Sequence, residues 1–293
     1  MAVVEGKSGC TAVAVKQKVN LYTDDYFGAG YGDKVAKTDK FEVTPKGCGT
    51  FSKGIFTGKK AETVTVTRLA KDGKNYLPVD SVSFTVEAPD YLKTDTSGKK
   101  PKAIKQVTSI KKGDEFDMSE YIGCPSVEPE FYEISDKKGN FTLNDPREGV
   151  VTVNASGSCK VTAYYCEEIE DLSDTAKVNA AKKNAAKIQF TIKSTIPTMK
   201  DAKVAAGKKV TVAVTKVSKA IQLTADDWSI VEVNAEGEPE FDSPSKAFTK
   251  SPVEKKKYMS CEVTATSDAA TGTKAALVCT IDEVEYWSII TVK

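Results

Sequence analysis

The chain has 293 residues, which at roughly 100–150 residues per domain suffices for two or three domains. Its 42 basic and 41 acidic residues give a net charge of +1, so the total favours neither a polyanion nor a polycation as partner. Histidine is absent, which excludes Ser-His and Cys-His catalytic pairs and the HExxH zinc site. Arg68 and Arg147 are the only arginines, so bidentate recognition of phosphate or guanine is poorly supplied, and we expect no nucleic-acid partner.

Aromatic residues gather near the N-terminus, between residues 21 and 34. Aromatic rings give a large contact area at low entropy cost, so this segment is a candidate partner-binding loop. The alternative is a long loop whose tyrosines fold back onto the domain. Three acids in the segment lack the D-x-D-x-D-G spacing of a calcium loop, so we expect no metal. The candidate partner-binding residues here are Tyr22, Tyr26, Phe27 and Tyr31.

The first predicted domain covers residues 1–92. Valine and threonine alternate over residues 64–67, and a similar pattern over 82–86 resembles a final strand. Alternation of β-branched residues predicts strands with one face on a core and one in water. Residues 93–102 are rich in lysine and contain Gly98 and Pro101, which predicts a linker.

The second predicted domain covers residues 103–195. We expect strands at residues 151–153, 161–164 and 188–192 on the same alternation. Between the last two, residues 171–187 are rich in alanine and lysine, and Ser173 is placed to cap a helix. The segment is either a short helical insertion at one end of the domain or a polar loop.

The third predicted domain covers residues 196–293, with strands expected at 210–215, 231–233, 263–266 and 288–292. Val233 and Val263 are 30 residues apart, whereas Val153 and Val161 in the second domain are 8 apart, so about 22 residues read as an insertion. Long loops inside compact domains are usually functional or disordered. We therefore take Phe241, Phe248 and Tyr258 as further candidate partner-binding residues; the alternative is a solvated insertion.

Internal repetition gives the fold class. Apolar-Thr-apolar triplets start at residues 84, 190 and 290, and Val-Thr pairs start at 64, 161 and 263. A third match relates residues 151–157 to 231–237. Many short strands with a repeat near 100 residues predict an all-β chain of three tandem immunoglobulin-like antiparallel β-sandwiches.

Seven cysteines are an odd number, and none forms a C-x-x-C pair, so we expect free thiols in a reducing compartment. A Cys261–Cys279 bridge requires that their segments pair. Glu5 and Lys7 interrupt any apolar signal core at the N-terminus, so we expect no export signal. No later window approaches the roughly 20 apolar residues of a membrane helix, so we expect no membrane insertion.

The second and third repeats resemble a known family. The pattern apolar-x-Val-Asn-Ala-x-Gly, followed by Val-Thr-Ala and an apolar-Thr-apolar final strand, is similar to bacterial immunoglobulin-like domains of group 2. Residues 41–47 and 54–58 carry a weaker likeness in the first repeat. The resemblance implies tandem spacers, adhesion modules, or head and tail decoration of tailed phages. It implies no catalytic residues.

These observations predict a non-enzymatic structural or adhesive protein with no cofactor. A phosphate-loop motif is absent, because Ile55 stands where it needs Lys. A dinucleotide motif is absent, because Gly28, Gly30 and Gly32 are spaced two and two, without the G-x-G-x-x-G pattern. We favour a tailed-phage virion component, in head decoration or tail, assembled in the bacterial cytoplasm and multivalent or oligomeric there. One alternative is a bacterial cell-surface adhesin or spacer. Another is a carbohydrate-binding accessory module. The expected partners are proteins of a larger assembly or a host-surface ligand, with a glycan as a further candidate.

Overall fold

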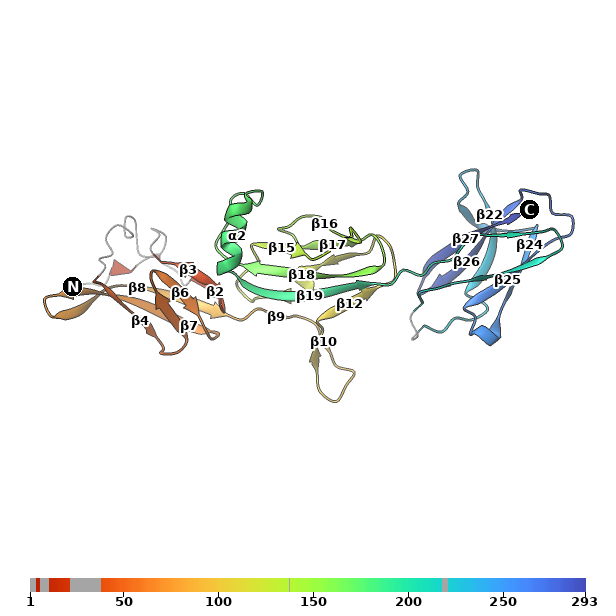
Figure 1. Cartoon of the computed structure of the whole chain (residues 1–293). Helices are drawn as coiled ribbons and strands as arrows, with labels where there is room; N and C mark the ends of the chain where they lie inside the picture. Colours follow the sequence, from red (N-terminus) through yellow and green to blue (C-terminus); the bar gives the residue numbers. More distant parts are fainter. Residues whose placement is uncertain (1–3, 6–10, 22–37, 137, 218–220) are drawn as a thin grey trace. The chain divides into compact units, whose positions relative to one another are not determined.

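Alternating Val, Thr and Ile residues form strands along nearly the whole chain, and the strands pair into sheets (Figure 1). The computed structural model describes residues 4–5, 11–21, 38–136, 138–217 and 221–293. Sheet pairing produces three β-sandwiches in succession along the chain. Each is described below by its own sheets.

The first sandwich packs two sheets around stacked aromatic rings. Phe56 and Phe84 come from opposite sheets, and their ring centroids lie 4.7 Å apart. Val64 and Val66 are fully buried beside them, as their alternation with threonine predicts. One sheet consists of β1 (Val4–Glu5), β2 (Thr11–Ala14), β8 (Asn75–Glu87), β7 (Glu62–Asp72) and β4 (Lys40–Thr44). The facing sheet consists of β3 (Lys18–Asn20), β6 (Ile55–Gly58) and β5 (Gly49–Ser52).

The second sandwich repeats this plan. Its four-stranded sheet consists of β12 (Gln106–Ser109), β19 (Ala186–Ser194), β18 (Gly157–Tyr165) and β15 (Phe131–Ile134). Its three-stranded sheet consists of β13 (Glu115–Asp117), β17 (Val150–Val153) and β16 (Phe141–Leu143). Phe190 and Ile192 alternate inward along β19 and are fully buried. A 3-10 turn, η2 (Met118–Glu120), leads into β14 (Ile122–Gly123), which pairs with β9 (Asp90–Tyr91).

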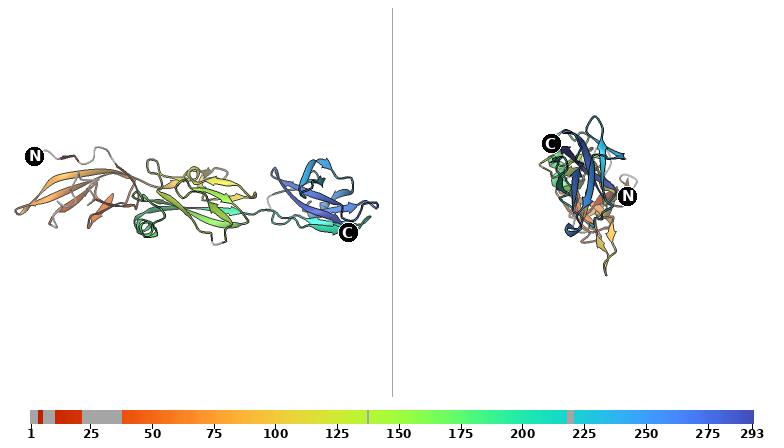
Figure 2. Two further views of the ribbon diagram at one scale, coloured as in Figure 1. Left: turned by 90° about the horizontal axis from the view of Figure 1, so that it is seen from above. Right: turned by 90° about the vertical axis from the view of Figure 1, so that its right-hand side faces the viewer.

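The third sandwich contains the largest buried side chain of the described chain, Trp228. One sheet consists of β20 (Ala202–Val204), β27 (Val284–Val292), β26 (Lys274–Ile281), β22 (Trp228–Val233) and β23 (Pro239–Pro244). The facing sheet consists of β21 (Lys209–Ala213), β25 (Ser260–Ala265) and β24 (Phe248–Pro252), and η3 (Glu254–Lys256) connects β24 to β25. The left-hand view of Figure 2 shows the strands of each sandwich grouped within its own body.

The three sandwiches share one strand order, which is that of an immunoglobulin-like fold. In each, the last strand pairs with the strand before it, and that strand pairs with the third strand of the order. The facing sheets are β3-β6-β5, β13-β17-β16 and β21-β25-β24, and β1, β14 and β23 are additional strands that this shared order does not count. The opening strand joins the last one, in parallel for β2 with β8 and for β20 with β27. The all-β fold class predicted from sequence is therefore confirmed.

Contacts group the chain into two compact units. The first comprises Met1–Val107, Asp114–Asn154 and Ser158–Lys193 and holds the first two sandwiches. The second comprises Thr108–Gly113, Ala155–Gly157 and Ser194–Lys293 and holds the third. The predicted boundaries at residues 92, 103 and 195 stay a prediction.

Three sets of similar sequence patterns relate the domains to one another, and the strand order corrects two of these sets. The final strands were matched correctly, since residues 82–86, 188–192 and 288–292 lie in β8, β19 and β27. Residues 64–67 and 161–164 lie in the next-to-last strands β7 and β18, but residues 263–266 begin in β25, one strand earlier in the order. Residues 151–153 and 231–233 likewise lie in non-equivalent strands, β17 and β22. Val-Thr alternation suits any half-buried strand, so it does not identify which strand it forms.

The predicted insertion of about 22 residues follows from that misalignment, since β24 corresponds to β16; only β23 is an additional strand without a counterpart in the second sandwich. Residues 239–244 and 248–252 are the edge strands β23 and β24 of the two sheets. They belong to the sandwich itself.

The segment at residues 171–187 does form a helix, α2 (Thr175–Asn184), in the connection between β18 and β19. Its N-cap is Asp174 and not Ser173. The Asp174 carboxylate accepts hydrogen bonds from the backbone N–H groups of Ala176 and Lys177, at 3.0 and 3.1 Å.

The predicted linker at residues 93–102 contains a hairpin of β10 (Thr94–Asp95) and β11 (Lys102–Ala103). It projects from the second sandwich, below the strand labelled β12 in Figure 1.

The six described cysteines are free. Cys261 and Cys279 lie in β25 and β26, which belong to different sheets and do not pair. The sequence condition for a bridge between them is therefore not met.

Candidate functional site

The structure separates the predicted contact residues. Tyr22, Tyr26, Phe27 and Tyr31 lie outside the described residues. Phe248 is 2% exposed and packs in the core of the third sandwich, so its ring offers no surface to a partner. Phe241 is exposed on β23, and Tyr258 is half-buried after η3. The last two mark two surface features of the third sandwich.

The first feature is an exposed aromatic pair. Phe241 is 44% exposed and Trp287, on β27, is 45% exposed. Their ring centroids are 6.3 Å apart at an interplanar angle of 79°, an edge-to-face contact. Strand β23 reaches this position because its register skips: Val231 pairs with Pro244 and Glu232 with Glu240, so the residues between bulge outward.

The pair lies over an apolar cluster on the outer face of its sheet. Ala276 and Val278 are buried, yet they alternate with β26 residues that point into the sandwich core. Strand β26 is therefore buried on both faces. Trp287 is opposite Val278 in the ladder, so the two side chains share the outer face. We call Phe241, Trp287, Val278, Val231 and Ile289 the aromatic face.

Exposed carboxylates flank the aromatic face in sequence. No lysine or arginine occurs at residues 228–245 or 280–292, the two segments that supply Phe241 and Trp287. Two exposed lysines, Lys203 and Lys274, flank Thr291 on the same face of the sheet, so the excess of acids is confined to the end of the face that carries Phe241 and Trp287. A local excess of like charge there gives a negative potential that attracts cations. The exposed acids in these segments are Glu236, Glu238, Glu240, Asp242, Asp282, Glu283 and Glu285.

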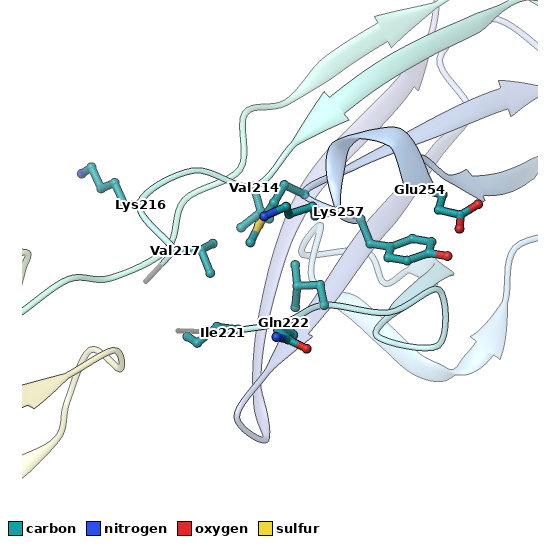
Figure 3. A pocket seen from close by; sticks show the side chains of 10 residues that line it. Val214, Lys216, Val217, Ile221, Gln222, Glu254 and Lys257 are labelled. Carbon is teal, nitrogen blue, oxygen red and sulfur yellow. The ribbon is translucent and has the colours of Figure 1, made fainter. Parts of the chain in front are cut away.

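The second feature is a cavity of about 800 Å³ in the third sandwich (Figure 3). Residues that follow β21 and residues that follow η3 line it. Lys216 and Glu254 lie on opposite sides of the cavity, and the side chain of Lys216 points away from the other lining residues. Most of the lining is apolar, namely Val214, Val217, Ile221, Leu223, Tyr258 and Met259.

Hydrogen bonds fix the backbone at the cavity rim in an unusual conformation. Lys257 and Tyr258 have φ values of 52° and 57°, consecutive left-handed residues without a glycine. The indole Nε1 of buried Trp228 donates to the Tyr258 carbonyl at 2.8 Å, and the Val214 N–H donates to the Met259 carbonyl at 3.1 Å. The rim is thus tied to the sandwich core.

Both features suit contact with apolar or amphipathic groups. Large exposed aromatic rings contribute strongly to binding when a partner covers them. Among the described residues, no group of His, Cys, Asp and Glu side chains is placed to hold a metal ion. In the same part of the chain, no helix has the length and apolar character needed to cross a membrane.

The described fold and surfaces define a tandem array of immunoglobulin-like sandwiches. No family model matches the chain, and no curated protein matches it. Solved structures that match include the I9–I11 tandem of titin, at 10% identity and TM-score 0.28, over 96% of this chain and 95% of that one. Immunoglobulin domains 1–4 of Sidekick-1 match at 10% identity and TM-score 0.23, over 98% and 72%. An endo-fucoidan hydrolase matches at 12% identity and TM-score 0.26, over 97% and 43%. The fold assignment rests on the strand order of this chain.

Sequence reasoning missed Trp287 and most cavity residues. Trp287 does carry a signal, because it stands at the outward position of the alternation Tyr286-Trp287-Ser288 in the final strand. A single exposed aromatic residue is ordinary, so this signal becomes informative only when the structure places Phe241 beside it. The cavity residues carry no such signal, because two loops from separate strands bring them together.

Proposed function

We propose that this chain is a non-enzymatic structural and adhesive protein, a head-decoration or tail component of a tailed-phage virion. The observation that carries the proposal is the threefold repetition of one sandwich. The interiors of the first and third sandwiches hold well-packed apolar clusters. Such bodies set distances and present surfaces, and many copies in an assembly increase avidity.

The state of the cysteines supports assembly in the bacterial cytoplasm. All six described cysteines are free, and four of them are buried. Proteins that fold in an oxidising compartment usually pair their cysteines. Free thiols therefore favour a virion component over the alternative of an exported bacterial adhesin or spacer.

The virion proposal is tested by locating the chain in the producing cells. Antibodies against the chain should label purified virions in immunogold microscopy, and mass spectrometry should recover it from virions banded by density. A virion preparation from a deletion of the gene is the matched control. Recovery of the chain from the cell wall, with none in virions, would overturn the proposal in favour of the adhesin.

The aromatic face favours protein contact and leaves a glycan as a second candidate ligand. Exposed tryptophan rings also stack on sugars, so a glycan array belongs in the test. Binding that disappears in Trp287→Ala would support the carbohydrate-binding alternative.

A further inference from the structure

The hairpin of β10 and β11 has no packing of its own. Every residue from Thr94 to Ala103 is exposed, and the two strands contribute only two residue pairs. Isolated two-stranded hairpins are marginally stable in water, because fixing each residue costs about 1–2 kcal/mol of backbone entropy. A surface that covers the hairpin would offset this cost.

The base of the hairpin is anchored and its tip is basic. Lys93 pairs with Glu120 at 2.8 Å and lies over the Tyr121 ring, which fixes the base. The tip carries Lys99 and Lys100, and Lys102 lies in β11 opposite Asp95. Its one acid, Asp95, accepts a hydrogen bond from the Ser97 N–H within the hairpin. We call residues 93–103 the basic hairpin.

The aromatic face of the third sandwich has the complementary chemistry. Exposed acids border Phe241 directly in sequence, at Glu240 and Asp242, and Glu285 stands two residues from Trp287. Lysine stems pack on aromatic rings while their ammonium groups reach nearby carboxylates. The whole chain has a net charge of only +1, but residues 93–103 carry four lysines and one acid, whereas residues 228–245 and 280–292 carry acids and no lysine or arginine.

We propose that the basic hairpin of one copy docks on the aromatic face of a second copy. The contact joins two different surfaces, so each copy keeps a free hairpin or a free face, and association continues into rings or filaments. The inference goes beyond the proposed function, because copies can associate in this way whatever larger assembly they join.

The test uses the full chain and two charge-reversal variants. One is Lys99→Glu/Lys100→Glu in the hairpin, and the other is Glu240→Lys/Asp242→Lys in the face. Sedimentation velocity at low salt over a range of concentrations measures association. We expect the unmodified chain to associate reversibly and to dissociate as salt rises, because screening weakens exposed charge pairs. Each variant alone should associate at least about tenfold more weakly, because like charges then meet at the contact.

Mixing the two variants distinguishes the proposed contact from a general effect of charge. The reversed hairpin matches the reversed face, and the two unmodified surfaces still match, so the mixture should associate like the unmodified chain. The matched control, Lys255→Glu/Lys256→Glu, reverses two exposed lysines elsewhere and should change association less than twofold. Trp287→Ala, which alters no charge, should also weaken association about tenfold or more if the ring is covered.

Three results would overturn the proposal. An unmodified chain that stays monomeric at low salt shows that copies do not associate and leaves an external cationic partner for the face. A mixture that stays monomeric while the unmodified chain associates places the contact elsewhere. Equal weakening by the Lys255/Lys256 control shows that only net charge matters.

Discussion

At the scale of single residues, the cysteines report how completely this chain fills its interiors. Burial raises the pKa of Cys279 and of Cys124 to about 12, and of Cys159 and Cys261 to about 11, because a thiolate there loses its water. Cys48 is different: the hydrogen bond from its Sγ to Glu62 Oε2, at 2.9 Å, is the main cause that raises its pKa. A thiolate at Cys48 would lose this hydrogen bond and would be repelled by the Glu62 carboxylate, so the neutral thiol is favoured.

These pKa shifts predict slow thiol chemistry in the folded protein. The reactive species is the thiolate, so at pH 8 the shifted thiols should react about a hundredfold more slowly in the native chain than in denaturant. Their rates should rise about tenfold per pH unit up to pH 10, since the thiolate fraction does so. Stopped-flow titration with a disulfide reagent measures both. All seven cysteines should react in unreduced denaturant, and recovery of five or fewer would show disulfides and contradict the cytoplasmic proposal.

At the scale of elements, local chemistry places α2 and local alternation places the strands. The helix has no fully buried residue, although Val178 and Ala181 pack against a cluster that contains Tyr164, and its first turn is held by the cap at Asp174. Asp174 satisfies two backbone N–H groups that the helix leaves without partners, whereas Ser173 hydrogen-bonds to Asp171 through both its N–H and its side chain.

The cap predicts a difference between neighbouring alanine variants. Asp174→Ala should lower the opening free energy of the helix by about 1 kcal/mol, so that its amides exchange about fivefold faster. Ser173→Ala should leave exchange nearly unchanged. Hydrogen exchange at Val178 and Ala181 is the readout, and equal effects of the two variants would show that Asp174 is not the working cap.

At the scale of the whole molecule, the hydrophobic residues form separate clusters in the first and third sandwiches. Separate cores predict unfolding that is not two-state across the chain. Both tryptophans, Trp228 and Trp287, lie in the third sandwich, so tryptophan fluorescence reports that body alone.

In urea unfolding, the transitions reported by two different probes therefore should not coincide. Fluorescence should trace the third sandwich, and far-UV circular dichroism should trace all strands, with midpoints or slopes that differ. The variant Trp287→Phe leaves buried Trp228 as the only tryptophan, so its fluorescence reports the core without a contribution from the surface ring. A single transition shared by both probes, with a slope that fits the full chain length, would contradict independent cores.

The sequence by itself determined the all-β class, the threefold repeat and the final strand of each sandwich, and it offered a helix near residue 175 as one of two alternatives. These follow from alternation and capping, which are local in the chain. Only the tertiary structure decided which repeat positions correspond, because Val263-Thr264 and Val161-Thr162 have the same pattern in strands with different neighbours.

The tertiary structure also decided between two phenylalanines that look alike in sequence. Phe248 points into the core while Phe241, seven residues earlier, is carried outward by the register skip in β23. The partner strands set that register, and partners lie far along the chain. Alternation shows that a strand has two faces with different side chains. The pairing register with neighbouring strands decides which of these faces packs on the core.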